Sequence, residues 1–140
     1  MLKGIPVKFS FNDAVHFTSC KASDFSFYQA ADVGNITEIT FPNTLTAINA
    51  YSFQDAASLV KVVVPPSVTT MSGEGTFRRC RALRAFICLG TTPPVRNRSN
   101  QFDNTTCIFY VPDEAVDAYK TASYWSSLAS RIKPISEYIE

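Results

Sequence analysis

The sequence predicts an α/β repeat fold: a short leucine-rich repeat solenoid, mainly β with parallel strands, a β-hairpin N-terminal cap and a two-helix C-terminal cap. Three observations lead to this prediction. Apolar residues recur with a period in the twenties, the first stretch alternates with a period of two, and the last stretch changes to helical spacing. A period of this length with L-x-x-L-x-L spacing is typical of stacked coils that bury their apolar edges against each other.

The repeat is clearest between Ile36 and Leu89, where seven positions, one of them a proline, recur in register. Leu59 lies 23 residues after Ile36 and Leu83 lies 24 residues after Leu59, with the extra residue in residues 72–75. In parallel stacks of coils, each inward side chain touches its equivalent in the coils above and below. The sequence therefore predicts an internal aromatic column of Phe53, Phe77 and Phe102.

Each copy should contribute one short strand. Alternation directs Ile39 and Phe41 inward. Pro42 and Pro65 end the first two strands, because proline cannot donate to a hydrogen-bond ladder. The four expected strands lie near residues 37–41, 60–64, 84–88 and 107–111.

The N-terminal residues 1–32 fit the repeat poorly. A solenoid exposes its core at both ends, so a terminal element of another kind is expected there. Residues 5–17 alternate around the turn pair Asn12-Asp13, which predicts a β-hairpin, with room for one degenerate coil around Phe27. We assign residues 1–32 to an N-terminal cap.

After Pro112 the spacing becomes helical. A short helix should begin at Asp113 or Glu114, where the helix dipole favours acidic residues. A second helix is expected after it, and this helix should end before Pro134. On length priors the chain is one domain, 1–140, with repeats at 33–112 and a helical cap at 113–140. The second helix would place Trp125, Leu128 and Ile132 on its inner face.

Two segments in the repeats and several in the tail carry a resemblance to a known family. Ile36–Pro42 and Leu45–Phe53 resemble the repeat of BspA-type leucine-rich repeat proteins. The end of such arrays is resembled by Thr91–Pro94, Phe102, Tyr110–Pro112, Ala118–Lys120 and Trp125. The resemblance covers roughly residues 33–135. It implies display at the bacterial cell surface, an extracellular location, and adhesion to a host or bacterial surface protein or to an anionic glycan.

Composition supports a globular chain without a strong charge preference. Apolar residues make up 46% and charged residues 18% of the sequence, and the net charge of +1 gives no reason to expect nucleic acid as a partner. No apolar run approaches the about 18 residues of a membrane span. Met1–Pro6 lacks a basic region followed by an apolar core, so no signal peptide is visible. Either the chain is not exported by that route, or this is a mature or trimmed form.

Residues for catalysis are scarce, and we expect no enzyme activity, no metal site and no cofactor. His16 is the single histidine, which excludes multi-histidine metal sites, and alternation turns it outward. The cysteines show no C-x-x-C spacing and fall largely on apolar repeat positions, so buried thiols are the main interpretation and one disulfide the alternative. A Cys20–His16 pair is the rival enzymatic hypothesis. The four cysteines are Cys20, Cys80, Cys88 and Cys107.

An arginine-rich stretch is the first candidate binding surface. No acidic residue occurs between Gly75 and Phe102. The first arginines follow the column residue Phe77 at the turn edge of the coil, and the later ones fall in the next coil, so both groups could stack into one patch. Arginine forks recognise carboxylate, sulfate and phosphate, as in a sulfated glycan, a lipid phosphate or nucleic acid. The alternative is a solvated edge balanced by nearby acids. The candidates are Arg78, Arg79, Arg81, Arg84, Arg96 and Arg98.

An apolar strip on the outward face of the sheet is the second candidate. With the strands in register, the outward rows become apolar toward the C-terminal coils, whereas a solvated face would be mostly polar. Three interpretations stay open: a partner surface, which could form a weak homo-oligomer; a cover by the N-terminal segment or the C-terminal helices; and an error in register. The strip consists of Val63, Ile87, Ile108 and Tyr110.

Together these observations predict a non-enzymatic bacterial cell-surface module that binds or adheres to a protein or glycan ligand. The binding role comes from the family resemblance, because the residues themselves supply no catalytic site. The alternative is a structural or spacer repeat domain of a larger surface or phage-tail-like assembly.

Overall fold

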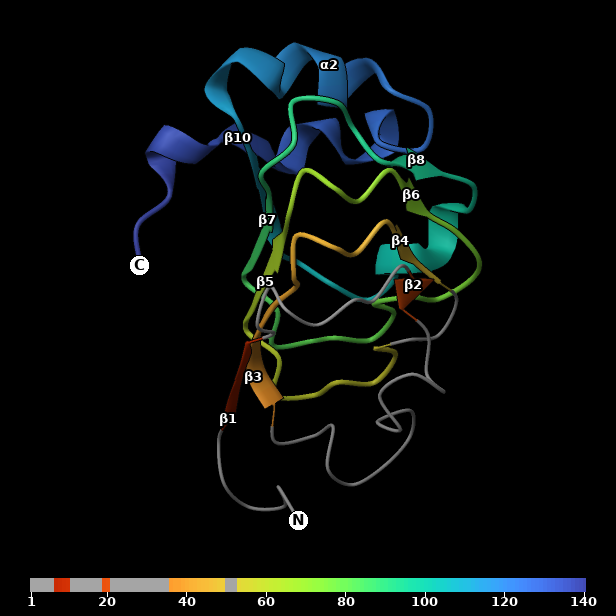
Figure 1. Ribbon diagram of the computed structural model, residues 1–140, viewed down its shortest axis with the longest axis vertical. Helices are drawn as coiled ribbons and strands as arrows, with labels where there is room; N and C mark the ends of the chain where they lie inside the picture. Colours follow the sequence, from red (N-terminus) through yellow and green to blue (C-terminus); the bar gives the residue numbers. More distant parts are fainter. Residues whose placement is uncertain (1–6, 11–18, 21–35, 50–52) are drawn as a thin grey trace.

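The computed structural model describes residues 7–10, 19–20, 36–49 and 53–140 (Figure 1). It contains two parallel sheets, one of six strands in the order β1-β3-β5-β7-β9-β10 and one of four strands in the order β2-β4-β6-β8. The larger sheet comprises β1 (Val7–Ser10), β3 (Ile36–Thr40), β5 (Lys61–Val64), β7 (Ala85–Cys88), β9 (Ile108–Val111) and β10 (Ile132–Pro134). The smaller sheet comprises β2 (Ser19–Cys20), β4 (Ala47–Ile48), β6 (Thr70–Met71) and β8 (Val95–Arg96). The predicted parallel solenoid is confirmed.

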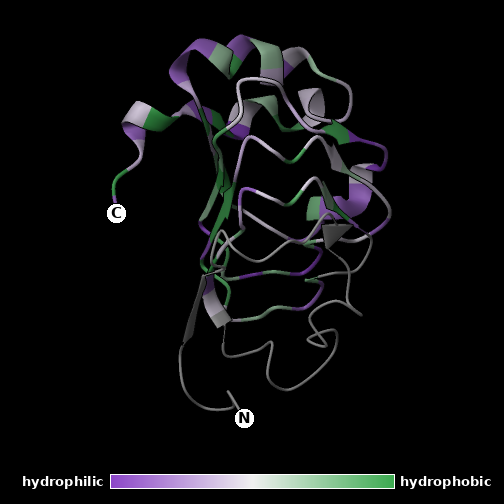
Figure 2. Cartoon of the chain, in the orientation of Figure 1, coloured by the Kyte–Doolittle hydropathy of each residue, from purple (hydrophilic) through white to green (hydrophobic). Residues whose placement is uncertain are grey.

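From β1 to β9 the chain runs alternately through the two sheets, so each of these four coils contributes one strand to each sheet before β9 and β10 complete the larger one. Figure 1 shows the coils stacked one above the next, with connecting segments that run from one sheet to the other. Hydrophobic residues follow the strands of the larger sheet in Figure 2. One continuous core fills the space between the two sheets, and in β5 the alternation of buried Val62 and Val64 with half-buried neighbours matches the expected period of two.

The aromatic column predicted from the repeat is present. The rings of Phe53 and Phe77 are stacked with centroids 5.5 Å apart and planes 9° apart, and those of Phe77 and Phe102 are 5.7 Å and 5° apart. Phe86 and Phe109 from the larger sheet meet the ring of Phe102 edge-on at 4.9 and 4.8 Å. Edge-to-face pairs of this kind are favourable beyond their buried area. All five rings are buried, so the column forms the centre of the core.

Prolines end the strands of the larger sheet in three coils. Leu45 N donates to Pro42 O at 3.0 Å and Val68 N donates to Pro65 O at 3.2 Å, so each proline opens a tight turn toward the smaller sheet. Leu89 takes the next equivalent position, and after β9 a proline returns: the carbonyl oxygen of Pro112 accepts from Ala115 N at 2.8 Å, in the first turn of the C-terminal cap. The same local signal therefore starts two repeat turns and the terminal helix.

The extra residue of the third coil is accommodated by two glycines. Gly73 and Gly75 have φ values of 86° and 62°, a backbone region that residues other than glycine rarely adopt. Gly73 N donates to Asn97 Oδ1 at 2.7 Å and Gly75 N donates to Asn100 Oδ1 at 3.2 Å, which ties the insertion to the next coil. The insertion therefore leaves the register of the core unchanged.

The two N-terminal strands extend the repeat sheets. β1 pairs in parallel with β3, with Phe9 opposite Ile39, and β2 pairs in parallel with β4, with Cys20 opposite Ile48. The parallel sheets therefore continue into the segment assigned to the N-terminal cap. The turn and the second arm of the predicted hairpin, together with His16 and Phe27, lie outside the described residues, so the hairpin stays a prediction.

The C-terminal cap contains one of the two predicted helices. A 3-10 turn, η3 (Asp113–Ala115), leads into α2 (Val116–Thr121). The second helix is replaced by a 3-10 stretch, η4 (Ser126–Arg131), after which β10 adds the sixth strand of the larger sheet. Ile132 lies opposite Phe109 in this pairing. A final 3-10 turn, η5 (Ile135–Glu137), follows β10.

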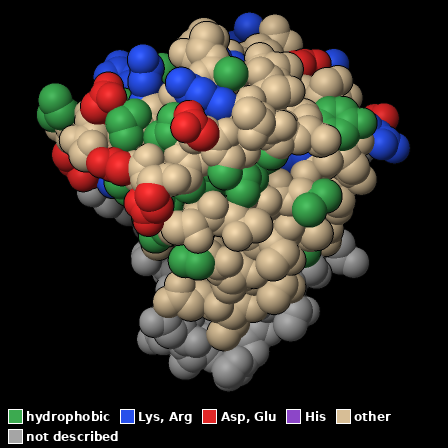
Figure 3. Space-filling model, turned by 90° about the horizontal axis from the view of Figure 1, so that it is seen from above, with side chains coloured by type: hydrophobic (Ala, Val, Ile, Leu, Met, Phe, Trp, Pro, Cys, Tyr) green, Lys and Arg blue, Asp and Glu red, His purple; other side chains and the backbone are tan. Residues whose placement is uncertain are grey.

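Trp125 closes the last coil, as the sequence suggested. Its side chain is fully buried, and its Nε1 donates to Pro94 O at 2.8 Å. Its ring meets those of Phe109 and Tyr119 edge-on at 5.7 and 5.2 Å. Seen from above, this end of the molecule presents acidic and basic side chains next to one another (Figure 3).

We predict that Phe77→Ala destabilises the fold by roughly 3–5 kcal/mol, because it removes the central ring of the column and leaves a cavity between two stacked rings. Urea unfolding followed by circular dichroism measures this cost. The matched control is Val95→Ala at an exposed apolar side chain, which should change stability by less than about 0.5 kcal/mol. Equal effects of the two changes would contradict the stacked core.

Candidate functional site

The outward rows of the larger sheet have the predicted register. Val63 lies opposite Ile87, and Ile87 lies opposite Tyr110. Ile108 lies opposite Ala85, two residues earlier in each strand. The side chains of Val63, Ile108 and Tyr110 are half-buried, whereas Ala85 and Ile87 are each only 5% exposed although they point outward. Something therefore covers part of this face.

The C-terminal segment lies across that face. The Tyr138 ring meets the Tyr110 ring edge-on with centroids 5.0 Å apart. The ammonium of Lys61, in the middle of the sheet on β5, lies 5.1 Å from the centre of the Tyr138 ring and donates to Glu140 Oε1 at 3.0 Å. The sequence left open a cover by the N-terminal segment or by the C-terminal helices. These contacts come from the C-terminal end, but from residues that follow η5 and not from a helix.

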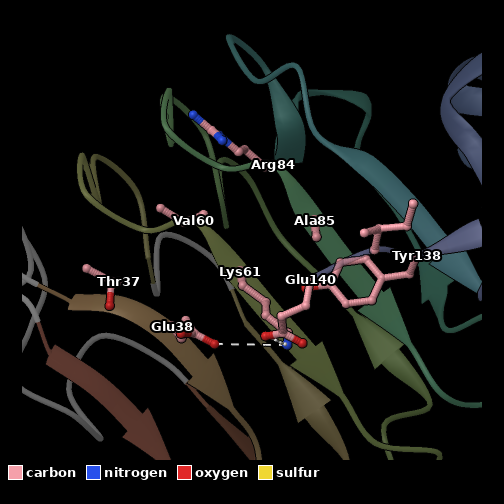
Figure 4. A pocket seen from close by; sticks show the side chains of 9 residues that line it. Thr37, Glu38, Val60, Lys61, Arg84, Ala85, Tyr138 and Glu140 are labelled. Carbon is pink, nitrogen blue, oxygen red and sulfur yellow. Dashed lines mark hydrogen bonds and ion pairs between the residues drawn. The ribbon is translucent and has the colours of Figure 1, made fainter.

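A pocket of about 350 Å³ opens between this segment and the sheet (Figure 4). Lys61 points across its floor toward Tyr138 and Glu140, and Arg84 stands at its edge. Lys61 lies on the outward row of β5, where alternation assigned it no role, and Tyr138 and Glu140 follow the last periodic position, so periodicity could not single them out. The pocket is lined by Thr37, Glu38, Val60, Lys61, Arg84, Ala85, Tyr138, Ile139 and Glu140.

The Lys61 ammonium is the electrostatic centre of the pocket. Its Nζ lies 3.0 Å from a Glu140 carboxylate oxygen and 4.0 Å from Glu38 Oε1. Burial acts to lower the pKa of Lys61, but hydrogen bonding to Glu140 and Tyr138 outweighs it, so the pKa is raised. Lys61 therefore stays charged at neutral pH and suits an acidic group.

Arg96 was predicted in the binding patch, but it does not belong there, because its side chain lies in the core. β8 pairs with β6 so that Arg96 lies opposite Met71, which continues the inward row of Ile48 and Met71. The side chain is 3% exposed and its guanidinium lies 5.0 Å from the centres of the Phe102 and Trp125 rings. Burial lowers the pKa of Arg96 to about 10, so the group is still charged at neutral pH.

Hydrogen bonds satisfy the buried guanidinium of Arg96. Its Nε donates to Gln101 Oε1 at 2.8 Å, and its Nη1 donates to Tyr124 O at 2.8 Å. The amide of Gln101 donates in turn to Met71 O at 2.7 Å. Arg96 thus links the last coil to the C-terminal cap, and it is not available to a ligand.

Arg79 is also held by the fold. It occupies a left-handed position with φ 61°, two residues after the column phenylalanine, as do Asp55 (φ 65°) and Asn104 (φ 60°) in the neighbouring coils. This stacking places Arg79 Nε and Nη2 at 2.6 and 2.8 Å from the two oxygens of Asp55. The hydrogen bond from Arg79 lowers the pKa of Asp55. Such a bidentate pair fixes the planar guanidinium in one orientation.

The other four arginines of the predicted patch differ in exposure. Arg78 is half-buried, whereas Arg81, Arg84 and Arg98 are exposed. Arg98 Nη1 donates to the neighbouring carbonyl at 2.8 Å, and Arg84 belongs to the pocket edge. The predicted patch is therefore reduced to three exposed guanidinium groups at the turns of the coils.

The cysteines whose side chains are described are buried free thiols, as the main interpretation predicted. Burial raises the pKa of Cys80 and Cys88 to about 12 and that of Cys107 to about 11. Because the thiolate is the reactive form, these side chains do not suit nucleophilic chemistry. The side chains of Cys20 and His16 lie outside the described residues.

Within the described ranges, no group of three or more histidine, cysteine, aspartate or glutamate side chains is placed to hold a metal ion. The same part of the chain contains no helix with the length and hydropathy needed to cross a bilayer. Among the features that the described surface offers to another molecule are the sheet face with its pocket and the exposed arginines.

Comparison with known proteins identifies the repeat. The family described as BspA type Leucine rich repeat region matches residues 21–109 in six copies. The match begins inside the segment assigned to the N-terminal cap, in agreement with the parallel pairing of β2 and β4. No curated protein matches the chain.

We predict that Arg96→Ala destabilises the fold by at least about 2 kcal/mol, because it leaves the buried Gln101 Oε1 and the carbonyl of Tyr124 without their donor. The control is Arg98→Ala, which removes an exposed guanidinium and should cost less than about 0.5 kcal/mol. Thermal and urea unfolding of both variants checks this difference. If the two substitutions had the same small effect, Arg96 would not be part of the core.

Proposed function

Because the chain belongs to the BspA-type leucine-rich repeat family, we propose that it is a non-enzymatic binding module of the bacterial cell surface. It adheres to a protein or an anionic glycan on a host or neighbouring cell. Leucine-rich repeats of this kind serve as protein-binding modules, and the extended surface of a solenoid suits that role.

Three exposed arginines on the turns of a rigid stack are the observation that carries the proposal. Arg81, Arg84 and Arg98 are exposed, and the ion pairs within the described part involve Lys61 and Arg79 instead. The planar guanidinium fork matches carboxylate and sulfate groups. Because the coils are held in register by the buried column, these side chains project from a fixed frame, which lowers the cost of ordering them on binding.

The three described thiols support a binding role, whereas the rival Cys20–His16 pair lies outside the described side chains. Cys80, Cys88 and Cys107 are buried and carry raised pKa values, whereas a catalytic thiol needs exposure and a lowered pKa. Recognition of a ligand at the surface needs neither an exposed thiol nor a lowered thiol pKa.

The proposal predicts that the double variant Arg81→Ser/Arg98→Ser loses at least about tenfold in affinity for its ligand on arrays of sulfated glycans and cell-surface proteins. Each lost charge-assisted hydrogen bond is worth about 1.5–3 kcal/mol, and about 1.4 kcal/mol corresponds to tenfold. Arg84 is left intact because it also borders the pocket.

The matched control is Lys120→Ser, which removes a positive charge from α2 and should bind like the parent chain. Circular dichroism confirms that both variants fold. If neither variant alters binding, or no ligand is found, the chain is better described by the alternative of a structural spacer repeat in a larger surface or phage-tail-like assembly.

A further inference from the structure

The segment that follows β10 lies on the sheet as a bound peptide would. η5 turns the chain away from the sheet edge, and Tyr138 then adopts extended angles, φ −72° and ψ 128°. From there the side chains of Tyr138 and Glu140 reach Tyr110 on β9 and Lys61 on β5, so the segment crosses several strands.

The alternation of the segment is that of an extended strand. Side chains two residues apart point to the same side of an extended chain. Tyr138 and Glu140 accordingly contact the sheet face, while Ile139 between them is 88% exposed. An aromatic ring and a carboxylate two positions later are thus the two groups that this face accepts.

The contacts that hold the segment are few. Its Glu140 side chain is 73% exposed in the ion pair with Lys61, and exposed ion pairs stabilise weakly. Ser136 N donates to Asp113 Oδ1 at 3.0 Å, which anchors the beginning of the segment and not its end. The residues from Tyr138 onward can therefore leave the sheet without disturbing the core.

The surface beneath the segment has a defined chemistry. Lys61 and Arg84 bring two positive charges to one pocket, against the single carboxylate of Glu38 from the sheet. Next to them lie the apolar side chains of Ala85 and Ile87, which are outward-facing yet only 5% exposed. The face combines an anion-accepting end with an apolar, aromatic-accepting area.

We propose that this face binds an acidic peptide segment of a partner protein, one that carries an aromatic residue followed two positions later by aspartate or glutamate. Residues 138–140 are its internal surrogate and leave the face when the partner binds. The inference rests on the proposed binding function and names the class of its ligand. An attached segment competes at a high effective concentration, so it sets a threshold that a partner must exceed.

The test compares the parent chain with the released variant Tyr138→Ser/Glu140→Gln. The probe is a fluorescein-labelled hexapeptide with the sequence of residues 135–140, its free end amidated so that it carries no terminal charge. Fluorescence anisotropy should show at least tenfold tighter binding to the released variant than to the parent chain. A control peptide with Ser and Gln in place of Tyr and the second Glu should not bind.

Adding Lys61→Gln to the released variant should abolish binding of the hexapeptide, and Arg84→Gln should weaken it severalfold. Circular dichroism checks that these variants keep the fold. The inference is overturned if the released variant binds no peptide up to millimolar concentration, if Lys61→Gln has no effect, or if both peptides bind equally.

Analytical ultracentrifugation of the parent chain and the released variant compares their oligomeric states and provides a second test. A dimer that dissociates in the released variant would overturn the inference, because the segment would then pair two copies of this chain. If the peptide inference fails, the test of the proposed function with Arg81→Ser/Arg98→Ser is unaffected, because neither Arg81 nor Arg98 lines the pocket. Conversely, unchanged ligand binding in Arg81→Ser/Arg98→Ser would not affect the peptide result.

Discussion

The stacking of each inward side chain on its equivalent in the next coil is the interaction on which the other features depend. The rings of Phe53, Phe77 and Phe102 are nearly parallel, and the strands on both sides of them keep one register. A close-packed interior tolerates little change in volume or position. A shift of one residue in any coil would turn its whole apolar set outward, so the core fixes the surface as well.

The same constraint explains where charged residues end up. Arg96 occupies an inward position because its strand follows the register of Met71, and the fold compensates by placing aromatic rings and Gln101 around the guanidinium. Asp55 and Arg79 meet because they occupy equivalent left-handed positions in adjacent coils. On the opposite side of the sheet, the outward row brings Lys61 under the C-terminal segment. Periodicity thus places both the structural charges and the accessible ones.

Sequence periodicity was sufficient for the features that repeat and insufficient where the period breaks. The column, the strands and the turn prolines followed from offsets between equivalent residues. Arg96 was misplaced because it was grouped with the arginines that follow the column residue Phe77. It lies six residues before Phe102, as Met71 lies six residues before Phe77, and it therefore takes the inward position of Met71. The apolar spacing around Ile132 suits a helix, yet the unpaired edge of β9 offered a strand partner, and tertiary pairing overrode local propensity. The contact between Tyr138 and Lys61 joins residues with no shared pattern, so only the folded chain reveals it.

A disulfide cross-link across the smaller sheet tests the register most directly. Thr70 lies opposite Val95, which is the pairing that directs Arg96 inward. Neighbouring strands in register bring Cα atoms within the roughly 4.4–6.8 Å that a disulfide spans. The account predicts that Thr70→Cys/Val95→Cys forms the cross-link under mild oxidation, as read by peptide mapping in a mass spectrometer, and that Thr70→Cys/Asn97→Cys does so far more slowly. Faster cross-linking in the second pair would contradict the stacked register.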